Sequence, residues 1–516
     1  MSDQISNNKR IAKNTMMLYI RMLLSIVVSL YTSRVVLDVL GVEDYGIYGL
    51  VGGVVAMFSF LNASMAGATS RFLTFELGRG DEIRVRDTFS SALIIHIGIA
   101  LVVFVLAETL GMWFLCNKLV IPEGRMVAAH WVYQCSIIST MLSITQVPYN
   151  ASIIAHERMG VYAYIEILNV TLKLLIVYLL TIGHFDKLKM YAVLVLSVSV
   201  IVMMVYRIYC MRNFHESHFR FVWKREILKP MLSFTGWDFY GNMCVTARQQ
   251  GMNFLINNFF SVVANASSSI ATTVNGIVSS FASNIITAFR PRIIKSYSQQ
   301  NWEEMQSMIN NAIKFSSLFL IMLAIPILFE TSFLIDLWLG QVPEYVVAFI
   351  RLILITNCVS MTNNVIIIGI HATGKIKRIS FLTGTMYLLS IPVSFIFLKL
   401  GYAAESVYII SLMSSVFIVS LNLWILKKQV CGIRILPILR VIAISILIAL
   451  FSGILIYFVY IGMEAGFRRL VVITLWCIVL ISLFTYLFAL DKNQRKYVTH
   501  FLLSKLYLKN GRKINS

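Results

Sequence analysis

Charged residues are scarce in this sequence and make up only 13% of its 516 residues. A water-soluble protein carries about 25% charged residues. Hydrophobic residues make up 58% of the chain, and its mean hydropathy is +0.78. Because a water-soluble core cannot bury this much apolar surface, lipid must cover part of it. The composition therefore excludes a soluble protein and predicts a polytopic membrane protein.

Cysteine is sparse as well. The seven cysteines are scattered and odd in number, without the spacing of a disulfide framework or a zinc site. The sequence also lacks a His-Glu-x-x-His pattern and a Gly-x-Ser-x-Gly turn. We therefore expect no metal and no cofactor, and we expect the cysteines to pack inside the protein.

Long apolar runs recur along the whole chain. Crossing a hydrocarbon layer of ~30 Å takes about 20 apolar residues. The first run contains Arg21 and has no signal-peptide cleavage site after it, so we expect it to remain as a helix. The runs predict an all-α protein of about 14 transmembrane helices. We number these spans one to fourteen and place them at 14–35, 46–70, 88–111, 126–150, 161–183, 188–210, 231–256, 260–288, 311–334, 345–370, 379–399, 404–426, 437–461 and 470–490.

The net charge of +20 has a simple origin in the loops between these runs. Of the 44 Lys and Arg residues, 32 lie in one set of alternating loops and termini and seven in the other set. This asymmetry is typical of the cytoplasmic side of a membrane protein. It predicts that both termini are cytoplasmic, and it excludes nucleic acid as the partner that the basic charge serves.

A weak internal similarity predicts two repeats. Span four ends in Asn150-Ala-Ser-Ile-Ile-Ala-His156, and span ten ends in Asn364-Val-Ile-Ile-Ile-Gly-Ile-His371. Transporters are commonly built from such repeats, with the substrate site between them. We expect an N-lobe at 1–210 (helices 1–6), an interfacial linker at 211–230, a C-lobe at 231–430 (helices 7–12), peripheral helices 13 and 14 at 431–490, and a basic cytoplasmic tail at 491–516.

Polar residues at helical spacing mark three of the spans. Amides and charges cannot face lipid cheaply, so these faces must point inward. They predict a hydrated central cavity lined by spans one, seven and eight, with hydrogen bonding between dry helices as the alternative. The faces include Arg21, Arg34, Asp238, Asn242, Gln249, Asn253, Asn265, Ser268 and Asn275.

The intramembrane charges are mostly positive. The cations are Arg21, Arg34, Lys173, Arg248 and Arg351, and the acids are Glu166 and Asp238. The excess predicts a positively charged cavity that suits an anionic solute. In span two, small residues such as Gly49 and Gly53 predict close packing between helices, with a mobile helix as the alternative.

Several segments resemble bacterial Wzx-type polysaccharide-unit flippases, which belong to the MOP exporter superfamily. They are Arg10-Ile-Ala-Lys-Asn14, Ser33-Arg34-Val-Val-Leu-Asp-Val-Leu-Gly41-Val-Glu43-Asp-Tyr45-Gly46-Ile-Tyr48, Ala66-Gly-Ala-Thr-Ser-Arg71-Phe-Leu and Phe289-Arg290-Pro291-Arg292. The resemblance implies a MATE-like fold of two six-helix lobes, here with an extra C-terminal helix pair.

The same resemblance implies a function. Such a protein moves an undecaprenyl-diphosphate-linked oligosaccharide from the cytoplasmic to the periplasmic leaflet of the bacterial inner membrane, for surface polysaccharides such as O-antigen and lipopolysaccharide. Membrane lipids surround it, a polysaccharide polymerase is a candidate partner, and either a proton or a sodium gradient would drive it.

Related lipid II flippases carry cavity arginines on the first and seventh helices, which implies roles for particular residues here. Either Arg21 or Arg34 would contact the diphosphate together with Arg248. The other expected substrate contacts are Asn242, Gln249, Asn253, Asn265 and Asn275, and the expected gating or ion-coupling residues are Glu166, Lys173, Asp238 and Arg351.

Two other function classes remain in view. A cation-coupled multidrug exporter of the same superfamily would favour an acid-rich cavity. A membrane polysaccharide polymerase or glycosyltransferase would place catalytic groups in sizeable external loops. The external loops of this chain are short and carry no paired carboxylates, so we expect a transporter rather than an enzyme.

Overall fold

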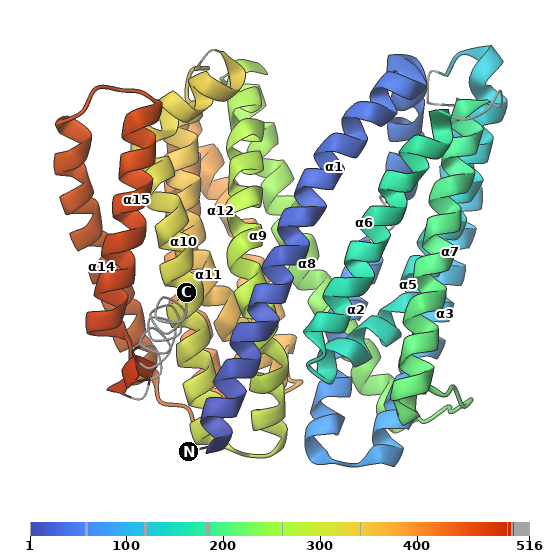
Figure 1. Ribbon diagram of the computed structural model, residues 1–516, viewed down its shortest axis with the longest axis horizontal. Coiled ribbons are helices and arrows are strands. Elements are labelled where there is room, and N and C mark those ends of the chain that lie inside the picture. Colours follow the sequence, from blue (N-terminus) through green and yellow to red (C-terminus); the bar gives the residue numbers. More distant parts are fainter. Residues whose placement is uncertain are drawn as a thin grey trace, which may run out of the picture. The chain divides into compact units, whose positions relative to one another are not determined.

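A computed structural model describes residues 2–56, 60–117, 121–181, 186–260, 262–340, 342–492, 494–496 and 499. Helices dominate these residues, and none of them forms a β-strand, which confirms the all-α prediction (Figure 1). The first helices are α1 (Ser2–Ala56), α2 (Phe60–Arg79), α3 (Glu82–Leu106), α4 (Met112–Asn117), α5 (Met126–Ala155), α6 (Met159–Thr181) and α7 (Lys187–Asn213). The others are α8 (Arg225–Phe259), α9 (Val262–Ser298), α10 (Trp302–Leu339), α11 (Val346–Ala372), α12 (Lys377–Lys399), α13 (Glu405–Gln429), α14 (Ile435–Ile461) and α15 (Phe467–Phe484).

Ten helical segments within the described residues are long and apolar enough to cross a membrane. The long helices outside this set are α1, α2, α8 and α9. These are the helices that carry the predicted polar faces and the small residues of span two. With them included, the chain has about fourteen crossing segments, in agreement with the prediction.

Gly41 divides α1 into two helical parts. Its φ of 78° and ψ of 166° lie outside the helical region. Such a positive φ is accessible to glycine without the strain that a side chain would bring. The break separates span one from the outer half of span two, so residues 42–56 and α2 together form the second crossing segment.

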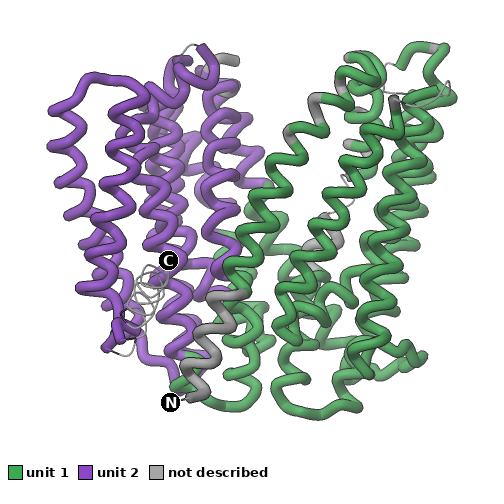
Figure 2. The backbone as a smooth tube through the Cα atoms, viewed as in Figure 1, with its two compact units in different colours: residues 1–246, 287–305, 368–385 green, residues 247–286, 306–367, 386–516 purple. Residues whose placement is uncertain are grey.

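Residue contacts divide the chain into two compact units, coloured separately in Figure 2. The first unit contains residues 1–246, 287–305 and 368–385, and the second contains 247–286, 306–367 and 386–516. The first unit thus joins the N-terminal helices to one end of α8, α9, α11 and α12. The lobe boundaries expected at 1–210 and 231–430 remain a prediction.

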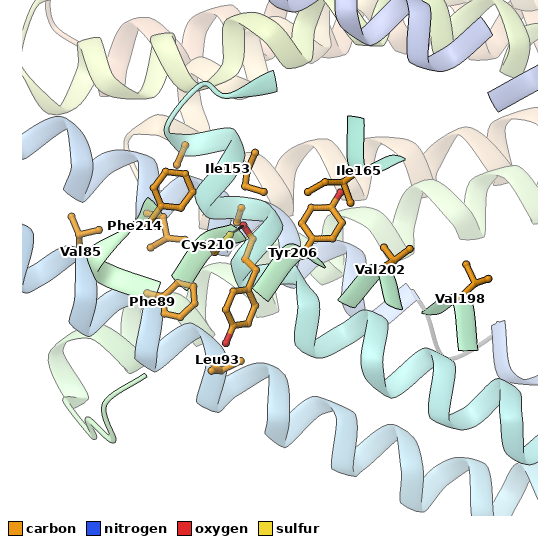
Figure 3. Close-up of a cluster of buried hydrophobic side chains, with 14 of the residues drawn as sticks. Val85, Phe89, Leu93, Ile153, Ile165, Val198, Val202, Tyr206, Cys210 and Phe214 are labelled. Carbon is orange, nitrogen blue, oxygen red and sulfur yellow. Dashed lines mark hydrogen bonds between the residues drawn. The ribbon is translucent and has the colours of Figure 1, made fainter. Parts of the chain in front are cut away.

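A cluster of buried side chains holds α3, α5, α6 and α7 together in the first unit. Figure 3 shows Phe89, Ile153, Ile165, Tyr206 and Phe214 packed against one another. Because lipid is as apolar as these side chains, close packing rather than water exclusion stabilises the cluster. It fixes the position of Tyr206, which contacts one of the predicted functional acids.

In the second unit, the C-terminal pair α14 and α15 packs on α10. The helix α10 bends at Glu330, where φ is −100° and ψ is 19°, four residues after Pro326. Glu330 is 1% exposed and forms a bidentate ion pair with Arg469 of α15. Nε of Arg469 lies 2.5 Å from Oε1, and Nη2 lies 2.9 Å from Oε2. This ion pair ties the C-terminal helices to the bend.

The predicted close packing around Gly49 is wrong. A Cβ atom added at Gly46, Gly49 or Gly52 would meet no atom within 4 Å. Nothing is described of the Gly53 surroundings. These glycines leave open space beside α1, whereas the tight glycine contacts of the first unit lie elsewhere, at Gly78, Gly374 and Gly384.

Candidate functional site

Arg71 of α2 binds the end of α11, at the end of the helices that the charge pattern places in the cytoplasm. Its Nη2 donates a hydrogen bond of 2.7 Å to the carbonyl of Ala372, and its Nε donates one of 3.2 Å to the carbonyl of His371. The last carbonyls of a helix lack intrahelical partners and attract cations. Arg71 is 6% exposed, so this interaction is shielded from water.

Gly374 makes this contact sterically feasible. Its φ is +74°, and a Cβ atom there would lie 2.8 Å from Nη2 of Arg71. Both the backbone conformation and the space therefore require glycine. The Gly369–Lys375 segment, similar at first sight to a phosphate-binding loop, is a helix-ending turn that receives an arginine.

The turn after α5 has the same form. Glu157 follows the last helical residue, Ala155, by two positions, as Gly374 follows Ala372, and its φ is also positive at 58°. A residue with a side chain adopts this conformation at a cost of roughly 1 kcal/mol. The Glu157 side chain forms an ion pair, because its Oε1 lies 3.3 Å from Nζ of Lys295 in α9. Asn14 of α1 also donates a hydrogen bond of 3.2 Å to the Glu157 carbonyl.

The two sets of contacts are reciprocal. Arg71 belongs to the second helix of the first predicted repeat and binds the turn after the fourth helix of the second repeat. Lys295 belongs to the second helix of the second repeat and binds the turn after the fourth helix of the first. We call Arg71, Glu157, Lys295 and the α11 carbonyls the cytoplasmic latch.

The helices α2 and α9 touch beside this latch. A Cβ atom at Gly78 would lie 1.9 Å from the Ser298 hydroxyl oxygen and 3.2 Å from the Lys295 Cα atom. The rings of Phe75 and Tyr297 also approach, with centroids 6.2 Å apart. The latch therefore lies beside a direct contact between the backbones of α2 and α9.

Asp238, a predicted coupling residue, lies farther along the same unit. Its Oδ1 is 3.9 Å from Nε2 of His371, and its Oδ2 accepts a hydrogen bond of 3.1 Å from Asn242. Arg290 of α9 interacts electrostatically with Asp238. The acid faces α2, since a Cβ atom at Gly67 would lie 3.9 Å from Oδ2. The predicted substrate residue Asn242 is thus a partner of a predicted coupling residue.

Arg21 and Glu166 converge on a pair of tyrosines. The guanidinium carbon of Arg21 lies 4.9 Å from the centre of the Tyr162 ring, and the two side chains share a hydrogen bond. The Tyr206 hydroxyl donates a hydrogen bond of 3.2 Å to Glu166. The structure therefore brings one predicted diphosphate residue and one predicted coupling residue into a single polar group formed by α1, α6 and α7.

Arg207 lies near the end of span six and is absent from the intramembrane cations that the sequence analysis counted. Its Nη2 donates a hydrogen bond of 3.1 Å to the Thr145 hydroxyl, and its guanidinium lies 5.5 Å from the Tyr149 ring centre. Nε of Arg207 is buried without a hydrogen-bond partner in the described part of the chain. Arg207 is therefore a further intramembrane cation, hidden by its place near the end of an apolar run.

Arg248 lies in the second unit. Its Nη1 donates a hydrogen bond of 2.8 Å to the Ser411 hydroxyl, and its guanidinium lies 4.7 Å from the Tyr387 ring centre. Its Nε is buried and has no hydrogen-bond partner among the described residues. A guanidinium that is desolvated and only partly satisfied is poised to bind an anion, because phosphate oxygens match its fork of donors.

The amides of α8 and α9 differ in their surroundings. Asn253 accepts a hydrogen bond of 3.1 Å from Ser268, which in turn accepts one of 2.8 Å from Tyr408. Oδ1 of Asn275 is buried without a partner in the described chain. Gln249 is exposed. These α8 and α9 amides therefore combine internal hydrogen bonding at Asn253 with a free buried acceptor at Asn275.

The remaining predicted residues are dispersed. Lys173 is exposed on α6. Arg351 is exposed, and its Nε donates a hydrogen bond of 3.0 Å to the Leu328 carbonyl beside the α10 bend. The side chains of Arg34 and Asn265 lie outside the described residues, and so does most of the tail 491–516.

A second ionic cluster, which the sequence analysis missed, lies at the other end of the first unit. Arg125 binds Asp44 through both carboxylate oxygens, and its Nη1 lies 3.1 Å from Oδ2 of Asp186. Asp44 follows the bend at Gly41 within the segment that resembles the flippases. Asp44 lies in α1, Arg125 directly precedes α5 and Asp186 directly precedes α7, so no local pattern in the sequence predicts their pairing.

Comparisons with known proteins agree with this architecture. The chain matches the model of a family described as polysaccharide biosynthesis protein over residues 37–348. No curated protein matches it significantly.

Similar solved structures include a MATE in the bent conformation, with a TM-score of 0.72 and 12% identity over 83% of this chain and 96% of that one. A multidrug resistance MATE family transporter of the MOP superfamily, in an outward-facing conformation, has a TM-score of 0.70 and 14% identity over 83% and 96%. A MOP superfamily transporter from Pyrococcus furiosus has a TM-score of 0.69 and 12% identity over 83% and 96%. At these identities the structures establish the fold.

The family match spans more than half of the sequence and confirms the resemblance that predicted a Wzx-type flippase of the MOP superfamily. The chain belongs to the polysaccharide biosynthesis protein family and is a multi-pass membrane protein with the MOP-superfamily transporter fold.

Proposed function

We propose that this protein flips an undecaprenyl-diphosphate-linked oligosaccharide from the cytoplasmic to the periplasmic leaflet of the bacterial inner membrane. The product would supply surface polysaccharide biosynthesis. The partly satisfied guanidinium of Arg248 carries the proposal, because a diphosphate that leaves water needs charge-assisted hydrogen bonds in its place. Arg21 offers a second half-buried guanidinium in the other unit.

We propose that the cytoplasmic latch is the gate of this transporter. Arg71 and the Lys295–Glu157 pair join helices of both predicted repeats at the predicted cytoplasmic end. A headgroup entering from the cytoplasm requires these contacts to break. Each contact is a small number of hydrogen bonds, with a net contribution of about 1–3 kcal/mol when a charged group takes part. Substrate binding energy of ordinary size therefore suffices to open the latch.

A multidrug exporter is the competing function within the same fold, and the relation to MATE transporters favours it. The intramembrane charges argue against it, since Arg21, Arg207, Arg248 and Arg351 outnumber Glu166 and Asp238, and the buried Glu330 is neutralised by Arg469. An enzyme would need catalytic groups near an aqueous loop. The connections at 400–404 and 462–466 have no room for such a site.

Deletion of the gene in its own bacterium tests the proposal. Surface polysaccharide should disappear while undecaprenyl-diphosphate-linked oligosaccharide accumulates at the cytoplasmic face. Plasmid-borne wild-type protein should restore export. Normal surface polysaccharide together with new sensitivity to cationic drugs would instead identify a drug exporter.

A further inference from the structure

A pocket of about 320 Å³ opens in the first unit between α1, α5 and α7. Its size lies at the lower end of the range of ~300–1,000 Å³ for small-molecule sites. Tyr48 and Gly52 line it from α1, and Ala192 and Val195 line it from α7. None of the residues discussed above for the diphosphate or for the latch lines this pocket.

One wall of the pocket is a column of hydroxyl groups on α5. Ser136, Ser139, Thr140 and Ser143 follow one another at steps of three and one residues, which places them on one helix face. Ser143 donates a hydrogen bond of 2.9 Å to the Ser139 carbonyl. The hydroxyls of Ser136, Ser139 and Thr140 have no hydrogen bond within the described chain. Each therefore offers one donor and two acceptor sites to a ligand.

The opposite wall contains an oriented aromatic ring. The rings of Tyr48 and Tyr191 meet edge to face with centroids 4.7 Å apart, and their hydroxyls share a hydrogen bond. Ile144 and Val195 add apolar surface beside the hydroxyl column. The pocket thus combines an aromatic ring, aliphatic surface and free hydroxyls, which matches the C–H faces and the hydroxyl edges of a sugar ring.

The described residues that line the pocket include no Asp, Glu, Lys, Arg or His. A phosphate or a uronic acid carboxylate placed there would lose its hydration without gaining a counter-ion, at a cost of several kcal/mol. A polyprenyl or acyl chain would leave the column of hydroxyls without partners. The lining therefore selects a polar, uncharged ligand, and the volume limits it to about one sugar ring.

We propose that this pocket is a binding subsite for one neutral sugar residue of the glycan. The inference rests on the proposed flippase function and adds to it a specificity element for uncharged hexose or N-acetylhexosamine units. It places this element in the first unit, apart from the arginines that would hold the diphosphate.

Gly52 allows a sharp test. A Cβ atom at this position meets no atom within 4 Å, so a side chain can start here without strain, and Gly52→Leu extends it toward the pocket that Gly52 lines. Gly46→Leu is the matched control, because Gly46 lies in the same helix, has equally open surroundings and does not line the pocket. Ser139→Ala is a milder change, which removes one pocket hydroxyl and does not fill the pocket.

The experiment compares binding of undecaprenyl diphosphate with binding of undecaprenyl-diphosphate-N-acetylglucosamine to the full-length protein in nanodiscs. The wild type and Gly46→Leu should bind the glycosylated lipid about tenfold more tightly, which corresponds to one or two net hydrogen bonds. Gly52→Leu should lose this difference and keep the affinity for the bare lipid, and Ser139→Ala should reduce the difference.

Two results would overturn the subsite. The first is full retention by Gly52→Leu of the preference for the glycosylated lipid. The second is an equal weakening of binding of the bare lipid, which would assign the pocket to the lipid chain. Failure of the wild-type protein to bind either lipid would refute the proposed function together with the subsite, and so is distinguishable from both.

Discussion

The guanidinium of Arg71 donates a hydrogen bond of 2.7 Å to the backbone carbonyl of Ala372, 301 residues away in the sequence. This bond joins the second helix of one predicted repeat to the end of the fourth helix of the other. The Lys295–Glu157 pair, at 3.3 Å, makes the reciprocal connection. Under the proposed function, these two contacts would hold the predicted repeats together at the predicted cytoplasmic end.

Arg71→Ala should loosen the turn after α11. Its loss leaves the Ala372 carbonyl without its hydrogen-bond partner and removes one of the two donors to the His371 carbonyl. We therefore expect a decrease of about 1–3 kcal/mol in the stability of this region. Hydrogen exchange of the amides around residues 371–375 should become faster. Arg79→Ala is the control, because Arg79 stacks on Phe75 as Arg71 does but makes none of these carbonyl contacts. Equal exchange in both variants would show that the latch contributes nothing to local stability.

Gly374→Ala should be more damaging than a substitution at any other glycine with a positive φ. The change strains the backbone and places a Cβ atom against the Arg71 guanidinium. Gly401→Ala is the matched control, since Gly401 has a φ of +87° and no atom within 4 Å of its Cβ position. Both variants should lose about 1 kcal/mol through the backbone. Thermal unfolding should reveal a further loss only for Gly374→Ala.

Arg248→Ala should abolish polysaccharide export while leaving the protein present in the membrane. The guanidinium has a buried, unpartnered Nε, so its removal relieves desolvation and should not destabilise the fold. Export measured by surface polysaccharide, with protein level from an immunoblot, separates the two effects. Ser411→Ala removes the hydrogen-bond acceptor of Arg248 but not its charge. Export should therefore persist in Ser411→Ala, and export in Arg248→Ala would count against the diphosphate role.

Glu330→Gln should destabilise the C-terminal helices. The substitution leaves the Arg469 guanidinium, whose side chain is 11% exposed, without its buried counter-charge. Breaking a buried ion pair from one side costs about 3–5 kcal/mol. The double variant Glu330→Gln/Arg469→Met removes both charges and should recover part of the lost thermal stability. An unchanged unfolding temperature in Glu330→Gln would mean that water reaches the pair.

Much of the fold follows from local patterns in the sequence. Apolar run lengths predicted about fourteen crossing segments, and polar stripes set α8 and α9 apart from the ten apolar segments. The two positive-φ turns show why the repeat was only partly visible. The sequence similarity aligned His156 with His371. In the structure, Glu157 and Gly374 occupy equivalent positions, each with a positive φ two residues after a helix end. A glutamate and a glycine share no chemistry by which a sequence could reveal this equivalence.

The candidate site was harder to predict because its contacts are long-range. Arg21, Arg248 and Asp238 stand out as charges within apolar runs. Arg71 was noticed only as part of a family-like segment, because a side chain that binds backbone carbonyls leaves no complementary residue in the sequence. Arg125 and Asp44 lie 81 residues apart, and only the assembled helices bring them together.

Under the proposed function, the contacts between α2 and α9 must open during lipid translocation. A Cβ atom at Gly78 would lie 3.2 Å from the Ser298 Cβ atom, close to the ~3.5–4.5 Å of a disulfide. The decisive measurement is the flipping of fluorescent undecaprenyl-diphosphate-oligosaccharide in proteoliposomes that contain Gly78→Cys/Ser298→Cys. Oxidation should stop flipping and reductant should restore it, with each single cysteine variant unaffected. Undiminished flipping by the fully oxidised double variant would contradict the account.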